Sequence, residues 1–198
     1  IDVENKHKTA EKISYLKDLT SDLIKGVRTA TFNLTPPELS DYGIGTGLAR
    51  LVEGLNNRTG KNILFDNRTN FQTRFDSSIE TNLYRITQEA INNAIKYNRV
   101  GGHVLIRSKA EGEFVKVSVE DTGLGIPEDA IHRIFERFYR VETREHMSVD
   151  GTGIGLAICD KIIKFYGGEI WVNSEKGKGS IFYFSLPRFP KIKHQIMP

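Results

Sequence analysis

Residues 121–127 read Asp-Thr-Gly-Leu-Gly-Ile-Pro, and residues 151–156 read Gly-Thr-Gly-Ile-Gly-Leu. Between these two glycine clusters, residues 139–150 are mostly polar and have no regular hydrophobic spacing. The first cluster follows residues that alternate like a strand, and the second precedes residues spaced like a helix. We therefore expect two loops at the ends of regular elements, joined by a mobile lid.

The first cluster follows residues 115–120, in which every second position is apolar. Asp121 therefore comes at the end of a strand, where the chain turns. Its carboxylate can only accept hydrogen bonds, which suits the exocyclic amine of a purine. Gly123 and Gly125 allow positive φ angles and let a flat ring approach the backbone. A plain Asp-Thr-Gly turn without a ligand is the alternative, and it is the commoner meaning of so short a motif.

The second cluster is followed by residues 154–163, whose apolar positions have helical spacing. Its glycines therefore lie at a helix N-terminus, where unpaired N–H groups and the helix dipole favour an anion such as a triphosphate. No Gly-Lys-Ser/Thr follows, so this is not a Walker A loop, and the dinucleotide pattern Gly-x-Gly-x-x-Gly is also absent. A flexible loop before a helix remains the alternative.

A third set of polar residues lies on a long helix that Asp76 or Ser77 is expected to cap, with Glu80 as the third residue of a capping box. Near its end, Glu89, Asn93 and Lys96 share one face. The amide oxygen at position 93 can provide one protein ligand to Mg²⁺, while phosphates and water provide the others. Lys96 and Tyr97 can reach phosphate oxygens as donors. The alternative is an ordinary solvated helix face.

The composition excludes several classes of protein. The 198 residues have a formal charge of +3, from 28 basic and 25 acidic side chains spread along the chain, which does not favour a nucleic-acid partner or a basic membrane surface. The single cysteine, Cys159, excludes a disulfide framework and is expected in the core. No apolar run reaches membrane length, so we expect a cytoplasmic domain whose parent protein has any membrane anchor elsewhere. Residue 1 is isoleucine, and we expect a piece of a longer protein.

The pattern along the chain predicts an α+β two-layer sandwich with helices over one face of a sheet. We expect three parts: residues 1–37 with a helix and linker, residues 38–187 as the main domain, and residues 188–198 as a tail. The first helix has a narrow apolar seam and ends at Thr35-Pro36-Pro37. Further helices are expected over residues 47–55, 76–97 and 154–166, the last ending at Gly167-Gly168. Strands are expected over residues 61–66, 72–75, 104–108, 114–120, 169–172 and 180–186.

Five segments in order resemble the conserved boxes of bacterial two-component sensor histidine kinases. Residues 89–97 (Glu-Ala-Ile-Asn-Asn-Ala-Ile-Lys-Tyr) resemble the N box, and residues 119–127 resemble the first glycine box. Residues 134–140 (Ile-Phe-Glu-Arg-Phe-Tyr-Arg) resemble the F box, and residues 151–156 and 177–180 resemble the second and third glycine boxes. Together they cover most of the chain, which makes the match highly specific.

This resemblance implies the GHKL (Bergerat) ATP-binding fold, a protein-histidine kinase activity, and ATP and Mg²⁺ as cofactors. Position by position, it implies Asn93 as the Mg²⁺ ligand, with Glu89 and Lys96 as further catalytic residues, and Asp121 as the reader of adenine. It also implies that Phe135 and Phe138 anchor the lid. The remaining ATP-binding residues that it implies are Lys96, Tyr97, Gly123, Gly125, Ile126, Phe138, Arg140, Gly151, Thr152, Gly153, Ile154, Gly155, Leu156 and Ser180.

The N-terminal part is similar to the second helix of a dimerisation and phosphotransfer domain and its exit into the catalytic domain. The resemblance therefore implies a homodimer through this helix, together with a first helix that this chain lacks, and a response regulator as partner. The exit at residues 32–44 resembles a kinase subclass that usually lacks a full F box, whereas residues from about 119 onward resemble the subclass with a long lid. A natural mosaic and an engineered fusion would both explain this combination.

The phosphoaccepting histidine of the family is expected on the first dimerisation helix, followed by an acidic residue. None of the five histidines has that context; they are His7, His103, His132, His146 and His194. We therefore expect the chain to bind Mg-ATP and to label itself poorly. Two alternatives remain open: a GHKL-type ATPase that uses Glu89 as a base, and a non-catalytic interaction module with the same fold.

Overall fold

A computed structural model describes residues 37–68, 74–147 and 151–189. The seam helix predicted within residues 1–34 and most of the predicted tail lie outside these ranges. The predicted dimerisation segment and the domain boundaries therefore stay predictions.

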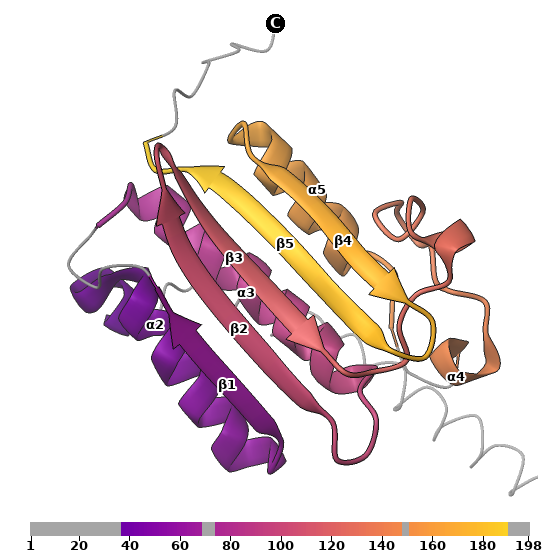
Figure 1. Cartoon of the computed structure of the whole chain (residues 1–198). Coiled ribbons are helices and arrows are strands. Elements are labelled where there is room, and N and C mark those ends of the chain that lie inside the picture. Colours follow the sequence, from indigo (N-terminus) through magenta and orange to yellow (C-terminus); the bar gives the residue numbers. More distant parts are fainter. Residues whose placement is uncertain (1–36, 69–73, 148–150, 190–198) are drawn as a thin grey trace, which may run out of the picture. The chain divides into compact units, whose positions relative to one another are not determined.

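The centre of the fold is a five-stranded sheet with the order β1-β2-β3-β5-β4 (Figure 1). The edge strand β1 is parallel to β2, and all other neighbouring strands are antiparallel. A parallel pair needs a crossover connection, and a long helix provides it here. The strands are β1 (Asn62–Asn67), β2 (His103–Glu111), β3 (Phe114–Asp121), β4 (Glu169–Glu175) and β5 (Gly179–Pro187).

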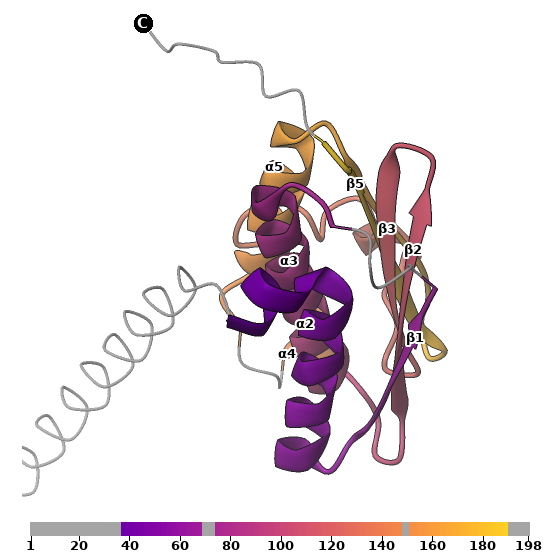
Figure 2. The same ribbon diagram turned by 90° about the vertical axis from the view of Figure 1, so that its left-hand side faces the viewer.

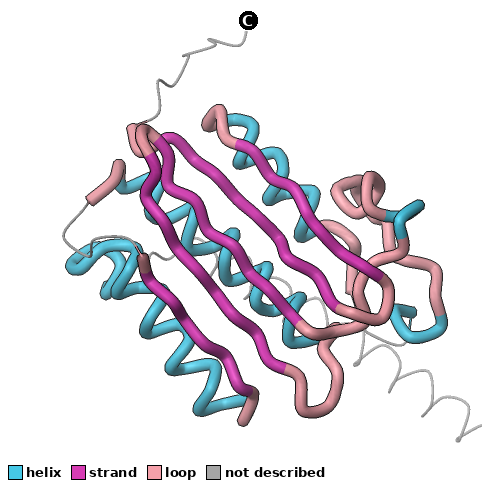
Figure 3. The backbone as a smooth tube through the Cα atoms, viewed as in Figure 1, coloured by secondary structure: helices cyan, strands magenta, loops and turns pink. Residues whose placement is uncertain are grey.

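The helices α2 (Pro37–Thr59), α3 (Ser77–Lys96) and α5 (Gly155–Phe165) form a second layer on one face of this sheet (Figure 2). The segment between β3 and α5 is mostly loop, as the pink tube in Figure 3 shows. Its described residues form only the short 3₁₀ helix η1 (Glu128–Ala130) and the four-residue helix α4 (Arg144–Met147). The predicted α+β two-layer sandwich is confirmed.

The hydrophobic core lies between the two layers. Alternate residues of the inner strands, such as Val117 on β3 and Phe184 on β5, are buried against the helices. The predicted apolar face of α3 packs there as well; Ile79, Leu83, Ile86, Ala90, Ile91 and Ala94 are buried, and Ile95 is half-buried at the margin. Cys159 on α5 is also buried, and this burial raises the pKa of its thiol to about 12. Cys159 is thus the predicted core residue and remains a neutral thiol at physiological pH.

Two predictions about the first part of the domain need correction. The helix predicted over residues 47–55 extends over the whole of α2, with a kink at Gly43, where φ is +79°. It begins at Pro37, where the missing N–H costs nothing because a first-turn N–H has no helical partner. The strand predicted at residues 72–75 is not formed at its two described residues, Arg74 and Phe75. Residues 72 and 73 lie outside the described ranges.

The start of α3 differs in detail from the predicted capping box. Asp76 is the N-cap and accepts a hydrogen bond from the N–H of Ser78 at 2.9 Å. Glu80 is therefore one position too late to be the third residue of the box. Its carboxylate instead accepts a hydrogen bond from the N–H of Phe75 and forms an ion pair with Arg74. Only 2% of the surface of Glu80 is exposed. This buried carboxylate fixes the chain that leads into α3.

The end of α5 is the predicted glycine C-cap. Gly167 has φ of +75°, and its N–H donates to the carbonyl of Lys164. The N–H of Gly168 donates to the carbonyl of Ile163. These two hydrogen bonds form a Schellman motif, which stops the helix and turns the chain into β4.

The sheet order brings together segments that are distant in sequence. Because β3 lies between β2 and β5, Asp121 at the end of β3 pairs with Ser180 at the start of β5. The helices α3 and α5 also contact each other, so the end of α3 faces the glycine turn that precedes α5. The five predicted boxes therefore meet at one end of the molecule.

Candidate functional site

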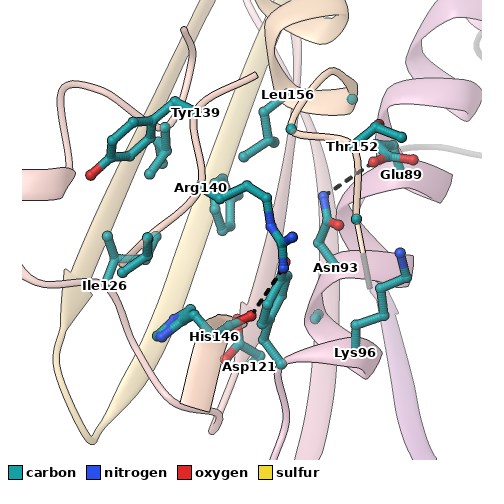
Figure 4. A pocket seen from close by; sticks show the side chains of 18 of the residues that line it. Glu89, Asn93, Lys96, Asp121, Ile126, Tyr139, Arg140, His146, Thr152 and Leu156 are labelled. Carbon is teal, nitrogen blue, oxygen red and sulfur yellow. Dashed lines mark hydrogen bonds between the residues drawn. The ribbon is translucent and has the colours of Figure 1, made fainter. Parts of the chain in front are cut away.

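An open pocket lies between the end of α3, the two glycine clusters and the segment that precedes α5 (Figure 4). The walls come from four separate parts of the chain, and each part carries one of the predicted motifs.

The first wall is the last two turns of α3. Glu89 and Asn93 are one helical turn apart, and Nδ2 of Asn93 donates to Oε1 of Glu89 at 3.3 Å (Figure 4). With its nitrogen engaged in this way, the amide can offer its oxygen to the pocket. Tyr97 caps the helix, and its N–H donates to the carbonyl of Asn93. Burial is the main reason that the pKa of Tyr97 is raised, so its hydroxyl stays protonated and can donate.

The second wall begins at Asp121, whose surface is only 7% exposed. The N–H of Gly123 donates to Oδ1 of Asp121 at 2.8 Å, and the backbone of Ser180 also hydrogen-bonds to this carboxylate. Burial raises the pKa of Asp121, and the two backbone hydrogen bonds oppose this rise. The result is a buried carboxylate with a fixed orientation, which suits a single polar group on a flat ligand.

The rest of the first glycine cluster packs directly on the turn between β4 and β5. Gly125 has φ of +65°, and a side chain there would overlap the carbonyl oxygen of Glu175. Next to it, the N–H of Ile126 donates to Oγ of Ser174 at 2.8 Å. Glycine is therefore required at position 125 for both its backbone conformation and its close approach.

The third wall is the second glycine cluster. Gly153 has φ of +68°, and Gly155 begins α5 so close to Glu89 that a side chain would overlap Oε1 of that residue. The residue before α5, Ile154, makes no side-chain capping hydrogen bond. The first N–H groups of α5 therefore remain available for an anion, which the helix dipole also favours.

The fourth wall is formed by the F box and the residues after it. The N–H of Phe138 donates to the carbonyl of Gly153 at 2.9 Å, which joins the F box to the second glycine cluster. Phe138 has a positive φ of 66°, and its ring is 72% exposed. The next residue, Tyr139, lies under the guanidinium of Arg133 at 4.2 Å from the ring centre. Arg140 extends into the pocket and donates to the carbonyl of His146 at 3.4 Å.

Most of the residues implied by the resemblance do line this pocket. They are Glu89, Asn93, Lys96, Tyr97, Asp121, Gly125, Ile126, Arg140, Gly151, Thr152, Gly153, Gly155 and Leu156. Four others do not line this pocket, and their contact with a nucleotide stays a prediction: Gly123, Phe138, Ile154 and Ser180. Gly123 and Ser180 hold the carboxylate of Asp121 through their backbones, while Phe138 contributes its backbone and turns its ring to solvent. The ring of Phe135 does pack against the core, as expected of a lid anchor.

Six residues that line the pocket were not predicted from the sequence: Ala94, Ile134, Tyr139, Val141, His146 and Phe182. Ala94 follows directly after Asn93 on α3, and Phe182 lies two residues after Ser180 on β5, on the same face of the strand. Both positions could therefore have been predicted from the periodicity of the helix and of the strand. Tyr139, Val141 and His146 lie in a segment without a hydrophobic period, so the sequence contains no such signal for them.

The donor set of the pocket fits a magnesium ion that is carried by a nucleotide. Within the three described ranges, no group of three or more His, Cys, Asp or Glu side chains could hold a metal ion by itself. One amide oxygen, at Asn93, is available next to a wall of backbone N–H groups. Mg²⁺ typically takes one or two protein ligands and completes its shell with phosphates and water.

Comparison with known proteins identifies the family. Residues 78–190 match the family described as histidine kinase-, DNA gyrase B-, and HSP90-like ATPases, which is more than half of the chain. The chain belongs to this family. Sensor histidine kinase WalK of Bacillus subtilis (strain 168) is 41% identical over 117 residues, which are 57% of this chain and 19% of WalK. Sensor histidine kinase RppB of Synechocystis is 43% identical over 110 residues, 56% of this chain and 24% of RppB.

Solved structures agree with this assignment. The catalytic domain of histidine kinase ThkA, in a nucleotide-free form, superposes with a TM-score of 0.58 and 28% identity over 74% of this chain and 91% of that domain. Full-length ShkA in complex with AMPPNP gives a TM-score of 0.60 and 32% identity over 74% of this chain and 30% of ShkA. The sandwich is thus the GHKL fold, and the part of the sensor histidine kinases that this chain matches is their ATP-binding catalytic domain.

The HATPase domain described here spans about a fifth to a quarter of the curated relatives that it matches. None of its described helices combines the length and the apolarity that crossing a membrane requires.

Proposed function

We propose that this chain binds Mg-ATP and transfers the γ-phosphoryl group to a histidine of a dimerisation domain, from which a response-regulator aspartate receives it. The observation that carries the proposal is the convergence of Asp121, Asn93 and the glycine turn around Gly153 in one pocket. The names of the relatives, and the AMPPNP bound to ShkA, support the same chemistry.

Each wall of the pocket has a role in this reaction. Asp121 would accept a hydrogen bond from the amine of adenine, and the N–H groups at the start of α5 would orient the phosphates. The hydroxyl of Tyr97 would donate to a phosphate oxygen, and Lys96 would add a positive charge. Asn93 would hold the magnesium ion, which neutralises the phosphate charge when it is bound.

The transfer itself needs positioning and charge neutralisation more than covalent chemistry by the protein. A nitrogen of the acceptor imidazole forms a bond to the γ-phosphorus, and the bond from that phosphorus to the β–γ bridging oxygen breaks. ADP leaves with the electron pair of that bond. We propose that the acceptor comes from another chain segment, because none of the five histidines of this sequence is directly followed by an acidic residue, as the acceptor histidine of the family is.

The contacts of Glu89 favour a kinase over a GHKL-type ATPase, in which a helix glutamate would activate water. Here its carboxylate accepts a hydrogen bond from the side-chain amide of Asn93 and packs against Gly155 at the start of α5. These two contacts favour a positioning role, in which Glu89 orients the magnesium ligand and the phosphate turn. Fast ATP hydrolysis by the chain alone, abolished by Glu89→Gln, would favour the ATPase instead.

The decisive experiment replaces Asn93 by alanine and supplies a histidine-bearing dimerisation domain as acceptor. Loss of the magnesium ligand should lower the rate of phosphotransfer at least about 100-fold, because metal stabilisation of the phosphates is worth several kcal/mol. Asn92→Ala is the matched control, since Asn92 is exposed on the same helix and does not line the pocket. Radiolabel transfer from γ-labelled ATP measures both variants.

Two outcomes would contradict the proposal. Undiminished phosphorylation of the acceptor by Asn93→Ala would show that the metal assignment is wrong. Calorimetry that detects no heat with ATP and Mg²⁺ on the folded wild-type chain would instead favour a non-catalytic interaction module.

A further inference from the structure

Arg133 lies just before the F box and is exposed outside the pocket. The central carbon of its guanidinium is 4.2 Å from the ring centre of Tyr139, and Tyr139 does line the pocket. Arg133 also forms an ion pair with Glu136 at 3.7 Å, in which both side chains are more than half exposed. Exposed ion pairs of this kind contribute little to stability. The contact with the ring is therefore the one through which Arg133 can act on the site.

The backbone of Phe138, the residue before Tyr139, has a conformation that needs support. Its φ is +66°, in the left-handed region that bulky residues avoid. A residue persists in such a conformation only when its surroundings hold it there. The ring of Phe138 is 72% exposed, so its own side chain cannot provide that support. The support must come from the residues around it.

The second glycine cluster and Tyr139 provide these contacts. The N–H of Phe138 donates to the carbonyl of Gly153 at 2.9 Å. A Cβ at Gly153 would lie 2.7 Å from the carbonyl oxygen of Tyr139 and 3.0 Å from the Cα of Phe138, so the two stretches of backbone are in direct contact. The ring of Tyr139 packs against the core and is half-buried. The glycine turn before α5 thus rests on a strained backbone that the ring of Tyr139 anchors.

We propose that Arg133 is a positioning residue of the phosphate end of the pocket, which is the turn at Gly153 and the start of α5. The guanidinium holds the ring of Tyr139 in place, and the ring in turn holds the backbone of Phe138. Without the guanidinium, Phe138 can relax towards a negative φ. That change would break its hydrogen bond to Gly153 and displace the N–H groups that would receive the phosphates. The inference rests on the proposed ATP site and adds to it a residue outside the pocket.

The test measures the affinities of the full 198-residue chain for ATP and for adenosine by calorimetry with Mg²⁺, for wild type and for Arg133→Gln. The affinity for ATP should fall about two- to fivefold, which is the change expected from the loss of one exposed cation–π contact. The affinity for adenosine should not change, because adenosine has no phosphate. Arg133→Lys keeps a cation for the ring and should retain most of the affinity for ATP. A parallel loss for both ligands would show a general structural role instead.

Arg50→Gln is the matched control. Arg50 forms an ion pair with Glu53 at 3.0 Å, with the same spacing along the chain as the pair of Arg133 and Glu136 and with similar exposure. It lies on α2 and does not line the pocket. This variant loses an exposed ion pair of the same kind, so its affinities for ATP and adenosine should equal those of the wild type.

Two further variants test whether Arg133 acts through the ring. In Tyr139→Phe, which keeps a ring, Arg133→Gln should still lower the affinity for ATP about two- to fivefold. In Tyr139→Leu, which has no ring, Arg133→Gln should have no further effect. Equal affinities of wild type and Arg133→Gln for ATP, or an undiminished effect in Tyr139→Leu, would overturn this inference alone. No ATP binding by the folded wild type would overturn the nucleotide site together with it.

Discussion

The two glycine clusters form opposite walls of one pocket, yet they are held in different ways. In the first, the backbone itself is fixed: the N–H of Leu124 donates to the carbonyl of Tyr97 at 3.0 Å, and the carbonyl of Leu124 accepts the N–H of Gly177 at 2.7 Å. In the second, Gly153 touches the backbone of the F box, while a side chain at Gly151 would meet no described atom nearer than the hydroxyl of Tyr97 at 3.7 Å.

This difference matches the two ends of the proposed ligand. A flat base is recognised by shape and by one or two fixed polar groups, so its pocket must exist before binding. A triphosphate is held by charge and by several N–H groups, which can adjust around it. The base end is therefore built on the sheet and α3, whereas the phosphate end lies between the lid and α5. Substitutions in the two clusters should differ accordingly.

Gly125→Ala should have the largest effect. The new Cβ would overlap the carbonyl oxygen of Glu175, and φ of +65° is unfavourable for alanine. Strain and overpacking together should lower the free energy of unfolding by about 3 kcal/mol and abolish ATP binding. Urea denaturation and calorimetry measure these effects.

Gly112→Ala is the control for Gly125→Ala. Gly112 has a similar φ of +57° in the turn between β2 and β3, but no atom lies within 4 Å of a Cβ there. It should cost only the backbone strain, about 1 kcal/mol, and leave ATP affinity unchanged. Equal losses of stability in the two variants would show that the packing against the β4–β5 turn is unimportant.

Gly153→Ala should have an intermediate effect that falls mainly on the phosphates. Its Cβ would lie 2.7 Å from the carbonyl oxygen of Tyr139, on the loop between β3 and α5. We expect a loss of about 1–2 kcal/mol in unfolding free energy, and a loss of about tenfold or more in affinity for ATP but not for adenosine. Gly151→Ala should change the free energy of unfolding by less than about 0.5 kcal/mol. Weakened adenosine binding in Gly153→Ala would contradict a separate phosphate end.

Asp121→Asn should have the smallest effect on folding and a clear effect on binding. Losing the charged acceptor should weaken ATP binding about tenfold or more.

Because burial raises the pKa of Asp121 in the folded state, its protonated form is favoured there. The stability of the wild type relative to Asp121→Asn should therefore be greatest at low pH and decline as pH rises through the folded-state pKa. Urea denaturation between pH 4 and 7 tests the sign, and a difference that grows with pH would contradict it.

The site residues could be predicted as far as local chemistry determines their roles. The carboxylate of Asp121, the amide of Asn93 and the glycine turn before α5 were each predicted from their own segment and meet in one pocket. Ser180 shows where such reasoning stops, because its hydrogen bond to Asp121 through the backbone could not be predicted from its own segment. That role depends on which strand lies next to β3. The burial of His146 likewise depends on the path of a loop whose sequence has no regular hydrophobic spacing.

The sequence by itself determined the periods of the helices and strands, the turns at their ends, and the residue types that can read a purine, bind magnesium and hold phosphates. These features depend on neighbours within a few positions along the chain. Only the tertiary structure decided that Ser180 lies beside Asp121, that Glu89 faces Gly155, and that the ring of His146 packs on Tyr97. Such pairings join residues far apart in sequence, and the order of strands and the burial of the whole core select them.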